Sequence, residues 1–199
     1  MLKVAVAVFA LVAVCYAQPP EPIKPPTIPE TFMTDFMVHR RDHEGEYMGK
    51  GTWERDFMKG MARERAEFMN RNATFEEERL ELFEEHMSYS ILKNSTGTFC
   101  REHDIPQNEM IQKMWDWVNS DEAHGDKHKD ERTGEMVDRW SINMPQSFGR
   151  LQLFVDEKDL TVPIALIRES RGVEEDVRFT NFKAMEPPAS DFVPPPACK

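Results

Sequence analysis

Short segments in which apolar and polar residues alternate follow one another from residue 32 onward, with tight turns between them. In the first segment Phe32, Phe36 and Val38 share one side of an extended chain. A period of two residues is typical of a strand with one buried face. The predicted strands cover residues 32–39, 51–58, 61–70, 79–92, 98–103, 137–143, 149–156, 162–168 and 173–182. Short strands joined by tight turns predict an antiparallel sheet.

Three segments follow other patterns. Apolar residues recur at helical spacing between Asn108 and Val118, and Asn108 can cap such a helix. Residues 120–133 are polar and predict an exposed loop. Residues 76–87 also fit a helix, but we favour the strand at 79–92. We expect a mainly β fold, an antiparallel half-open barrel that clasps one or two helices.

The amino terminus carries the pattern of a secretory signal peptide at residues 1–17. Lys3 precedes an apolar run from Val4 to Val14, and small residues close the segment at Ala17. An uncleaved anchor is the alternative, although the run is short for a membrane span. We expect a secreted, extracellular protein with a proline-rich leader at 18–31, outside the core, and one β domain at 32–199.

Acidic residues outnumber basic ones, 36 to 25, and the formal net charge is -11. Such a chain repels nucleic acid phosphates, so we expect no nucleic acid partner. No second apolar run of membrane length follows the first, and we do not expect an integral membrane protein. The acidic clusters could bind calcium weakly, and we predict no other metal site and no cofactor.

Two cysteines, Cys100 and Cys198, remain after removal of the signal peptide. In an oxidising compartment an even pair predicts a disulfide bond, with intermolecular pairing as the alternative. Asn72 and Asn94 each begin an Asn-x-Ser/Thr sequence and are predicted N-glycosylation sites. Asn94 stands at a predicted hairpin tip, where a bulky glycan is tolerated.

Catalytic motifs are missing from the sequence: it contains neither a Gly-x-Ser-x-Gly elbow nor a phosphate-binding glycine loop. We predict no catalytic residues. The first functional hypothesis is a secreted, non-enzymatic glycoprotein that acts through an unidentified protein or matrix partner, or through weak calcium contacts. The second is a carrier of an apolar small molecule or lipid.

The end of the chain carries the most specific motifs. Residues 178–182 end a strand in Phe-Thr-Asn-Phe, and Phe192-Val193-Pro194 precedes the last cysteine. Together with Gly51-Thr52-Trp53, these motifs make the chain similar to ependymin-related secreted glycoproteins, echinoderm members included. The resemblance implies a half-open barrel like that of LolA-type lipoprotein carriers, with an apolar concavity, secretion, glycosylation and a developmental role. Classical ependymins carry more cysteines.

The carrier hypothesis depends on the surplus of Phe, Met and Trp, which can line a pocket for an apolar guest. We expect the 108–118 helix to lie over the mouth of that pocket. The expected lining residues are Phe36, Trp53, Phe57, Met110, Met114, Trp115, Phe154 and Phe179.

Overall fold

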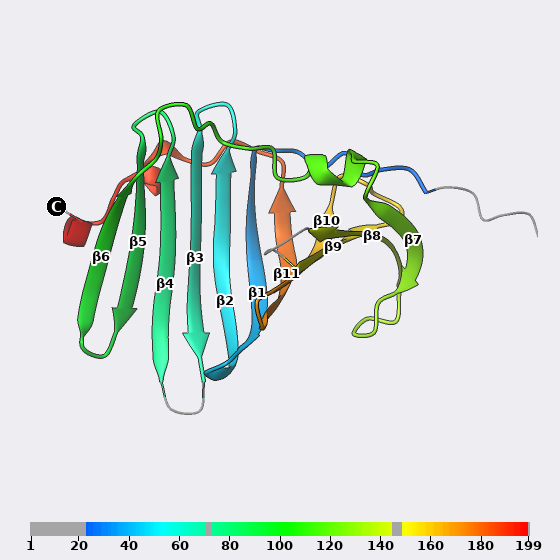
Figure 1. The fold of residues 1–199 in the computed structure, drawn as a ribbon, viewed down its shortest axis with the longest axis horizontal. Helices are drawn as coiled ribbons and strands as arrows, with labels where there is room; N and C mark the ends of the chain where they lie inside the picture. Colours follow the sequence, from blue (N-terminus) through cyan, green and yellow to red (C-terminus); the bar gives the residue numbers. More distant parts are fainter. Residues whose placement is uncertain (1–22, 71–72, 145–148, 199) are drawn as a thin grey trace, which may run out of the picture.

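In a computed structural model, which describes residues 23–70, 73–144 and 149–198, eleven antiparallel strands form one open, curved sheet (Figure 1). Its order is β6-β5-β4-β3-β2-β1-β11-β10-β9-β8-β7, so neighbours in the sequence pair and β11 closes on β1. The strands are β1 Phe32–Asp42, β2 Gly45–Asp56, β3 Met61–Met69, β4 Thr74–Leu82, β5 Met87–Asn94, β6 Gly97–Asp104, β7 His124–Lys129, β8 Met136–Met144, β9 Gly149–Asp156, β10 Pro163–Ser170 and β11 Val173–Lys183. The mainly β, antiparallel prediction is confirmed.

The predicted helix is wrong, because the described residues form no α-helix. They form three short 3-10 helices: η1 at Asp116–Asn119, η2 at Ala189–Phe192 and η3 at Pro196–Cys198. Around η1, tertiary partners take the backbone groups that an α-helix would pair internally. The Glu30 carboxylate accepts hydrogen bonds from the N–H groups of Met114 at 2.8 Å and Trp115 at 3.2 Å.

Two strand predictions also need correction. Residues 79–92 form parts of β4 and β5 with a turn between them, where His86 adopts a positive φ of 56°. Residues 124–129, predicted as loop, form the edge strand β7. Cross-strand ion pairs support this polar strand: Lys127 lies 2.6 Å from Asp138, and Arg139 lies 2.5 Å from Asp126.

The main core lies on the concave face, where the sheet curves over itself. Four aromatic rings contact one another in this core. The ring centroid of Phe32 lies 6.0 Å from that of Trp53 and 6.1 Å from that of Trp115, and the centroid of Phe179 lies 6.1 Å from that of Trp53. The remaining buried members are aliphatic and aromatic side chains, most of them from β1–β3 and β8–β11. Ile28 is also buried here, so part of the leader packs in the core, contrary to expectation.

The chain between β6 and η1 crosses the strand ends above this core (Figure 1). Glu30 holds it from one side through the two N–H groups described above. Arg55 lies 3.7 Å from Glu30 and donates a hydrogen bond to the carbonyl of Gln112. This pair of charged residues therefore fixes the crossing segment over the upper end of the core.

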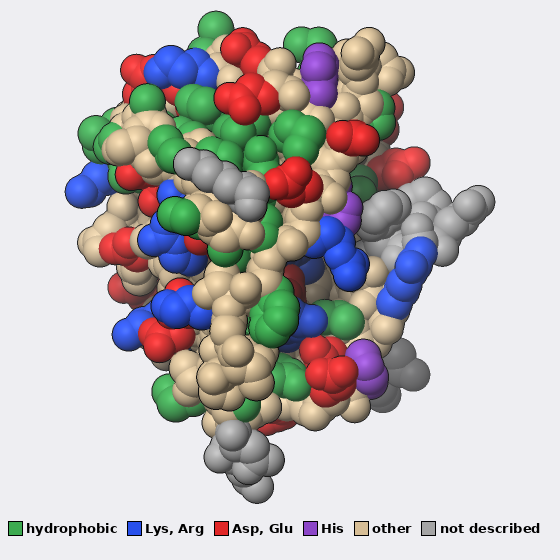
Figure 2. Space-filling view, turned by 90° about the vertical axis from the view of Figure 1, so that its left-hand side faces the viewer, with side chains coloured by type: hydrophobic (Ala, Val, Ile, Leu, Met, Phe, Trp, Pro, Cys, Tyr) green, Lys and Arg blue, Asp and Glu red, His purple; other side chains and the backbone are tan. Residues whose placement is uncertain are grey.

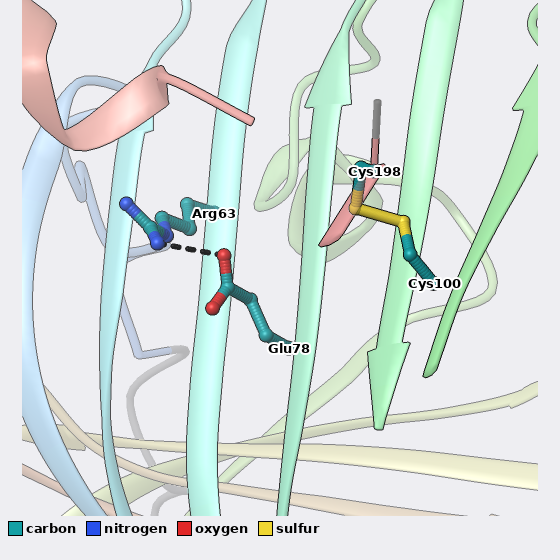
Figure 3. The surroundings of a disulfide bond; sticks show 4 residues. All are labelled: Arg63, Glu78, Cys100 and Cys198. Atoms are coloured by element: carbon teal, nitrogen blue, oxygen red, sulfur yellow. Dashed lines mark ion pairs between the residues drawn. A yellow bond between two sulfur atoms is a disulfide. The ribbon is translucent and has the colours of Figure 1, made fainter. Parts of the chain in front are cut away.

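The carboxy-terminal tail covers the opposite, convex face of β3–β6. Phe192 and Cys198 pack there with Leu80 and Ile91, and Cys198 is bonded to Cys100 on β6 (Figure 3). The predicted disulfide is thus present in the structure. Under the tail, Arg63 pairs with Glu78 at 2.7 Å and donates to the carbonyl of Asp191 (Figure 3).

Replacement of both cysteines by serine should lower the free energy of unfolding by about 4–5 kcal/mol, because the bridge closes a loop with a sequence separation of 98 residues. Urea unfolding measures the loss, and reduction of the wild-type protein should reproduce it. An unchanged urea midpoint in the C100S/C198S variant would show that the disulfide bond does not stabilise the folded protein.

Replacement of Glu30 by Gln should lower the free energy of unfolding by about 1.5–3 kcal/mol, because a charged acceptor of two partly buried N–H groups is lost. Hydrogen exchange at the N–H groups of Met114 and Trp115 should accelerate. Glu131→Gln, at an exposed position, serves as the control and should leave both rates unchanged. Equal exchange in the wild type and in E30Q would contradict the role of this carboxylate.

Candidate functional site

The concave face changes character at β3. On β1 and β2 the inward positions are mainly apolar, as at Phe36 and Val38, and glycines at 49 and 51 make room for those side chains. On β3 Glu64 is the one charged residue among the inward positions, and from β4 to β6 the inward positions are mostly polar or charged. Charged side chains resist burial without water or a partner, so the sheet cannot close tightly over them.

Strand register arranges these inward positions in rows across the sheet. The middle row runs from Glu64 on β3 through Arg79 and Ser90 to Arg101 on β6. Strands lie about 4.8 Å apart, so the row spans about 14 Å. The row above carries Ala62, Glu81, Ser88 and His103, and the row below carries Ala66, Glu77, Leu92 and Phe99. On β5 and β6 the upper two rows are polar and the lower row is apolar, and its two residues, Leu92 and Phe99, are called the apolar row below.

A cavity of about 790 Å³ lies against these rows. Figure 2 views the molecule from the β6 side and shows a hollow with basic and hydrophobic side chains at its walls. Side chains from the far half of the sheet, Arg168 on β10 and Glu175 on β11, also line it. The lining residues are Glu64, Ala66, Phe68, Glu77, Glu78, Arg79, Ser90, Ile91, Leu92, Phe99, Cys100, Arg101, His103, Arg168 and Glu175.

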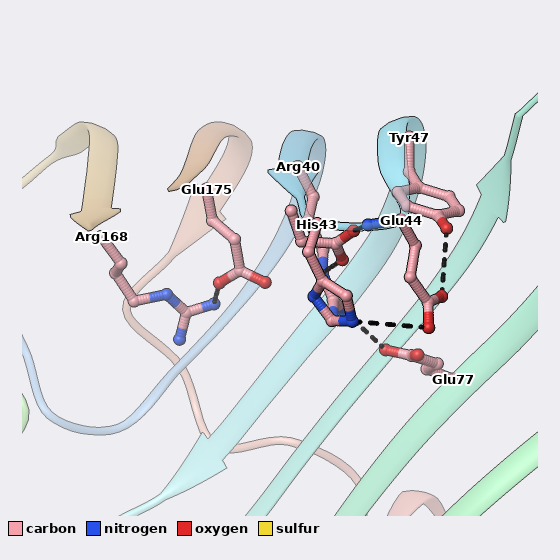
Figure 4. A network of polar contacts seen from close by, with 8 residues as sticks. Arg40, His43, Glu44, Tyr47, Glu77, Arg168 and Glu175 are labelled. Atoms are coloured by element: carbon pink, nitrogen blue, oxygen red, sulfur yellow. Dashed lines mark hydrogen bonds and ion pairs between the residues drawn. The ribbon is translucent and has the colours of Figure 1, made fainter. Parts of the chain in front are cut away.

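Ion pairs hold the floor of the cavity. The Nη2 atom of Arg168 lies 2.7 Å from a carboxylate oxygen of Glu175 and 3.8 Å from one of Glu64, so one guanidinium forms ion pairs with two carboxylates. Arg40, from β1, reaches Glu77 on β4 at 3.4 Å (Figure 4). These contacts join the two halves of the sheet and fix the position of the acidic groups.

Burial shapes the acidity of two of these carboxyl groups. It raises the pKa of Glu64, and the Arg168 guanidinium opposes that rise. It also raises the pKa of Glu77, where Arg40 opposes the rise and the like charge of Glu175 adds to it. Both groups therefore ionise less readily than free glutamate.

The predicted pocket residues lie in four different places. Phe36, Trp53, Trp115 and Phe179 belong to the packed core, and Met114 is partly buried against it. Phe154 belongs to another cluster with Val137 and Ala165, and the Arg178 guanidinium lies over its ring. Phe57 is half-buried in the turn after β2, and Met110 is 73% exposed. None of the eight lines the 790 Å³ cavity.

The two predicted N-glycosylation sites lie away from these clusters or outside the described residues. Asn94 ends β5 at a hairpin tip, and its side-chain oxygen accepts hydrogen bonds from the N–H and hydroxyl groups of Thr96. Asn72 lies outside the described residues, as do the predicted signal peptide and residues 18–22 of the leader. Glycosylation at both asparagines stays a prediction.

Within the described part of the chain, no group of three or more His, Cys, Asp or Glu side chains is arranged to hold a metal ion. Weak calcium binding stays a prediction. Across the same residues, no helix has the length and apolar character that a membrane crossing requires.

No protein-family model matches the chain, and no curated protein matches its sequence. Among solved structures, it is similar to an outer membrane lipoprotein-sorting protein domain from Vibrio parahaemolyticus (7% identity, TM-score 0.36, 81% of this chain and 88% of that chain). LprF from Mycobacterium bovis matches with 12% identity and a TM-score of 0.42, over 78% of this chain and 87% of that one. A LolA superfamily protein from Nitrosomonas europaea matches with 8% identity and a TM-score of 0.38, over 83% and 90%. At these TM-scores the likeness carries no argument about function.

Replacement of Glu64 by Gln should stabilise the protein at pH 7. The pKa of Glu64 is higher in the folded protein than in the unfolded chain, so ionisation of Glu64 lowers the free energy of unfolding. This loss develops as the pH rises from the pKa of the unfolded chain through that of the folded protein. Gln removes this cost, and Arg168 keeps Glu175 as its partner. Thermal unfolding should show a higher Tm for E64Q at pH 7 and a smaller gain at pH 4.

Glu67→Gln is the matched control, because Glu67 lies on the same strand and is exposed on the other face. It should show no comparable pH-dependent gain. A fall in Tm of E64Q at pH 7 would mean that the attraction of Arg168 outweighs burial at this position.

Proposed function

We propose that this chain is a secreted, non-enzymatic carrier that binds a small amphipathic molecule in the concave cavity. The observation that carries the proposal is the cavity of about 790 Å³, whose walls combine an apolar row with charged rows. Ligand sites in proteins occupy about 300–1,000 Å³ and combine apolar walls with a few polar groups that orient the guest.

The apolar row supplies contact area for such a guest. Phe99 is 54% exposed and Leu92 is 38% exposed, although both face the concave side. Their exposed area would leave water when an apolar chain binds, with a gain of about 25 cal/mol per Å². Phe68 also lines the cavity on the β3 side, although it is buried in the packed core.

The proposal differs from the sequence hypothesis in where the guest binds. Four of the six aromatic residues expected to line the pocket belong to the packed core, and the space lies beside them, over β3–β6. A guest there would meet ion-paired groups as well as apolar ones, which favours an amphipathic molecule over a purely apolar one.

Secretion is part of the same proposal. The intramolecular Cys100–Cys198 bridge supports it, because disulfides persist in oxidising compartments. The ependymin resemblance, a developmental role and action through an extracellular protein or matrix partner stay predictions.

The proposal is tested with the neutral fluorescent probe N-phenyl-1-naphthylamine. The wild-type protein should bind it saturably at one site. Leu92→Asp and Phe99→Asp, at exposed positions that the fold tolerates, should each weaken binding about tenfold, since about 1.4 kcal/mol of apolar contact is lost.

Met48→Asp is the control, because Met48 is 61% exposed on the convex face. It should leave the dissociation constant unchanged. Absence of saturable binding to the wild type, or equal binding by F99D and the wild type, would overturn the carrier function.

A further inference from the structure

The β6 side of the cavity carries basic groups and no acidic ones. The inward positions of β5 are Ser88, Ser90, Leu92 and Asn94, and those of β6 are Gly97, Phe99, Arg101 and His103. The two acids of β6, Glu102 and Asp104, face the other side. In a chain with 36 acidic and 25 basic residues, this is a local reversal of the charge balance.

Three polar side chains of this wall lack partners. Among the described residues, no ion pair or side-chain hydrogen bond involves the Arg101 guanidinium, the His103 imidazole or the Ser90 hydroxyl. The other inward arginines are engaged: Arg79 lies 2.5 Å from Glu81, and Arg168 lies 2.7 Å from Glu175. Among the described residues that line the cavity, the basic and hydroxyl side chains without any ion pair or side-chain hydrogen bond therefore lie on β5 and β6, whereas Arg168 on β10 keeps an ion pair although its Nε has no hydrogen-bond partner.

These donors stand next to the apolar row. Ser90 and Arg101 are directly paired across β5 and β6, and Leu92 and Phe99 form a directly paired couple one step further along the same inward face. Inward residues two apart on a strand lie about 7 Å from each other. A ligand can therefore place a head group on Arg101 while its chain covers Phe99.

We infer that Arg101, His103 and Ser90 form a recognition site for the anionic head group, a carboxylate or a phosphate, of a chain-bearing amphiphile. This inference rests on the proposed carrier function and names the ligand class. A guanidinium offers a planar set of N–H donors that matches a carboxylate or phosphate, and a serine hydroxyl beside it adds one more. The acids of the floor keep their own arginine partners.

Charge also selects against other head groups. A quaternary ammonium placed beside Arg101 would meet like charge, and the inward positions of β5 and β6 offer no acidic side chain to pair with it. An uncharged alcohol would leave the guanidinium without a counter-charge. The expected order of affinity for ligands with the same chain is therefore anion first, alcohol second and cation last.

The test compares dodecanoate, dodecyl phosphate, dodecan-1-ol and dodecyltrimethylammonium by isothermal titration calorimetry on the mature protein, below their micellar concentrations. The two anions should bind at least tenfold more tightly than the alcohol, as a charge-assisted hydrogen bond provides. Arg101→Gln should remove this difference by weakening the binding of the two anions. Arg65→Gln, on the convex face of β3, is the matched control and should keep the preference.

Three outcomes would overturn the inference. The first is equal affinity for dodecanoate and dodecan-1-ol, and the second is an unchanged anion preference in R101Q. The third is displacement of dodecanoate by acetate or inorganic phosphate at similar concentrations, which would indicate a site for a free anion instead of a head group. Retained binding of dodecan-1-ol separates failure of the head-group site from failure of the carrier function.

Discussion

The change from aromatic to charged side chains across the concave face is the constraint on which the rest of the structure depends. Where the inward residues are Phe32, Trp53 and Phe179, the sheet closes on itself and excludes water. Where they are Glu64 and Arg79, closure would bury charge at a large cost. The same curved sheet therefore has a packed end and an open end, and the cavity is a consequence of composition as much as of curvature.

Polar contacts fix the segments that lie around the junction between the packed end and the open end of the sheet. Glu30 and Arg55 hold the crossing segment over the packed end, and Arg168 joins the two halves of the sheet through Glu64 and Glu175. On the convex side, the disulfide and the Arg63–Glu78 pair hold the tail against β3–β6. The tail supports from behind the part of the sheet that forms the cavity wall, so the wall keeps its shape without a packed partner in front of it.

Alternation in the sequence predicts most of the sheet, and β9 has the bounds that the pattern gives, 149–156. The cysteine pairing was also predictable, because two cysteines in an oxidising compartment leave few choices. The segment at 108–118 was not, because its backbone donors bond to Glu30, which is more than 80 residues away in the sequence. The residues of the cavity wall could not be predicted from the sequence for a different reason. On β3 and β4 charged residues occupy both faces, as Glu64 and Arg65 do, and only the strand register shows which of them face inward.

The most direct measurement of the central claim is a crystal structure of the mature protein. It should show ordered water or a bound amphiphile in the space between Arg168 and the wall formed by β5 and β6, with the aromatic core packed beside it. A structure in which β5 and β6 close onto β10, so that Leu92 and Phe99 are buried and no space remains, would contradict the account.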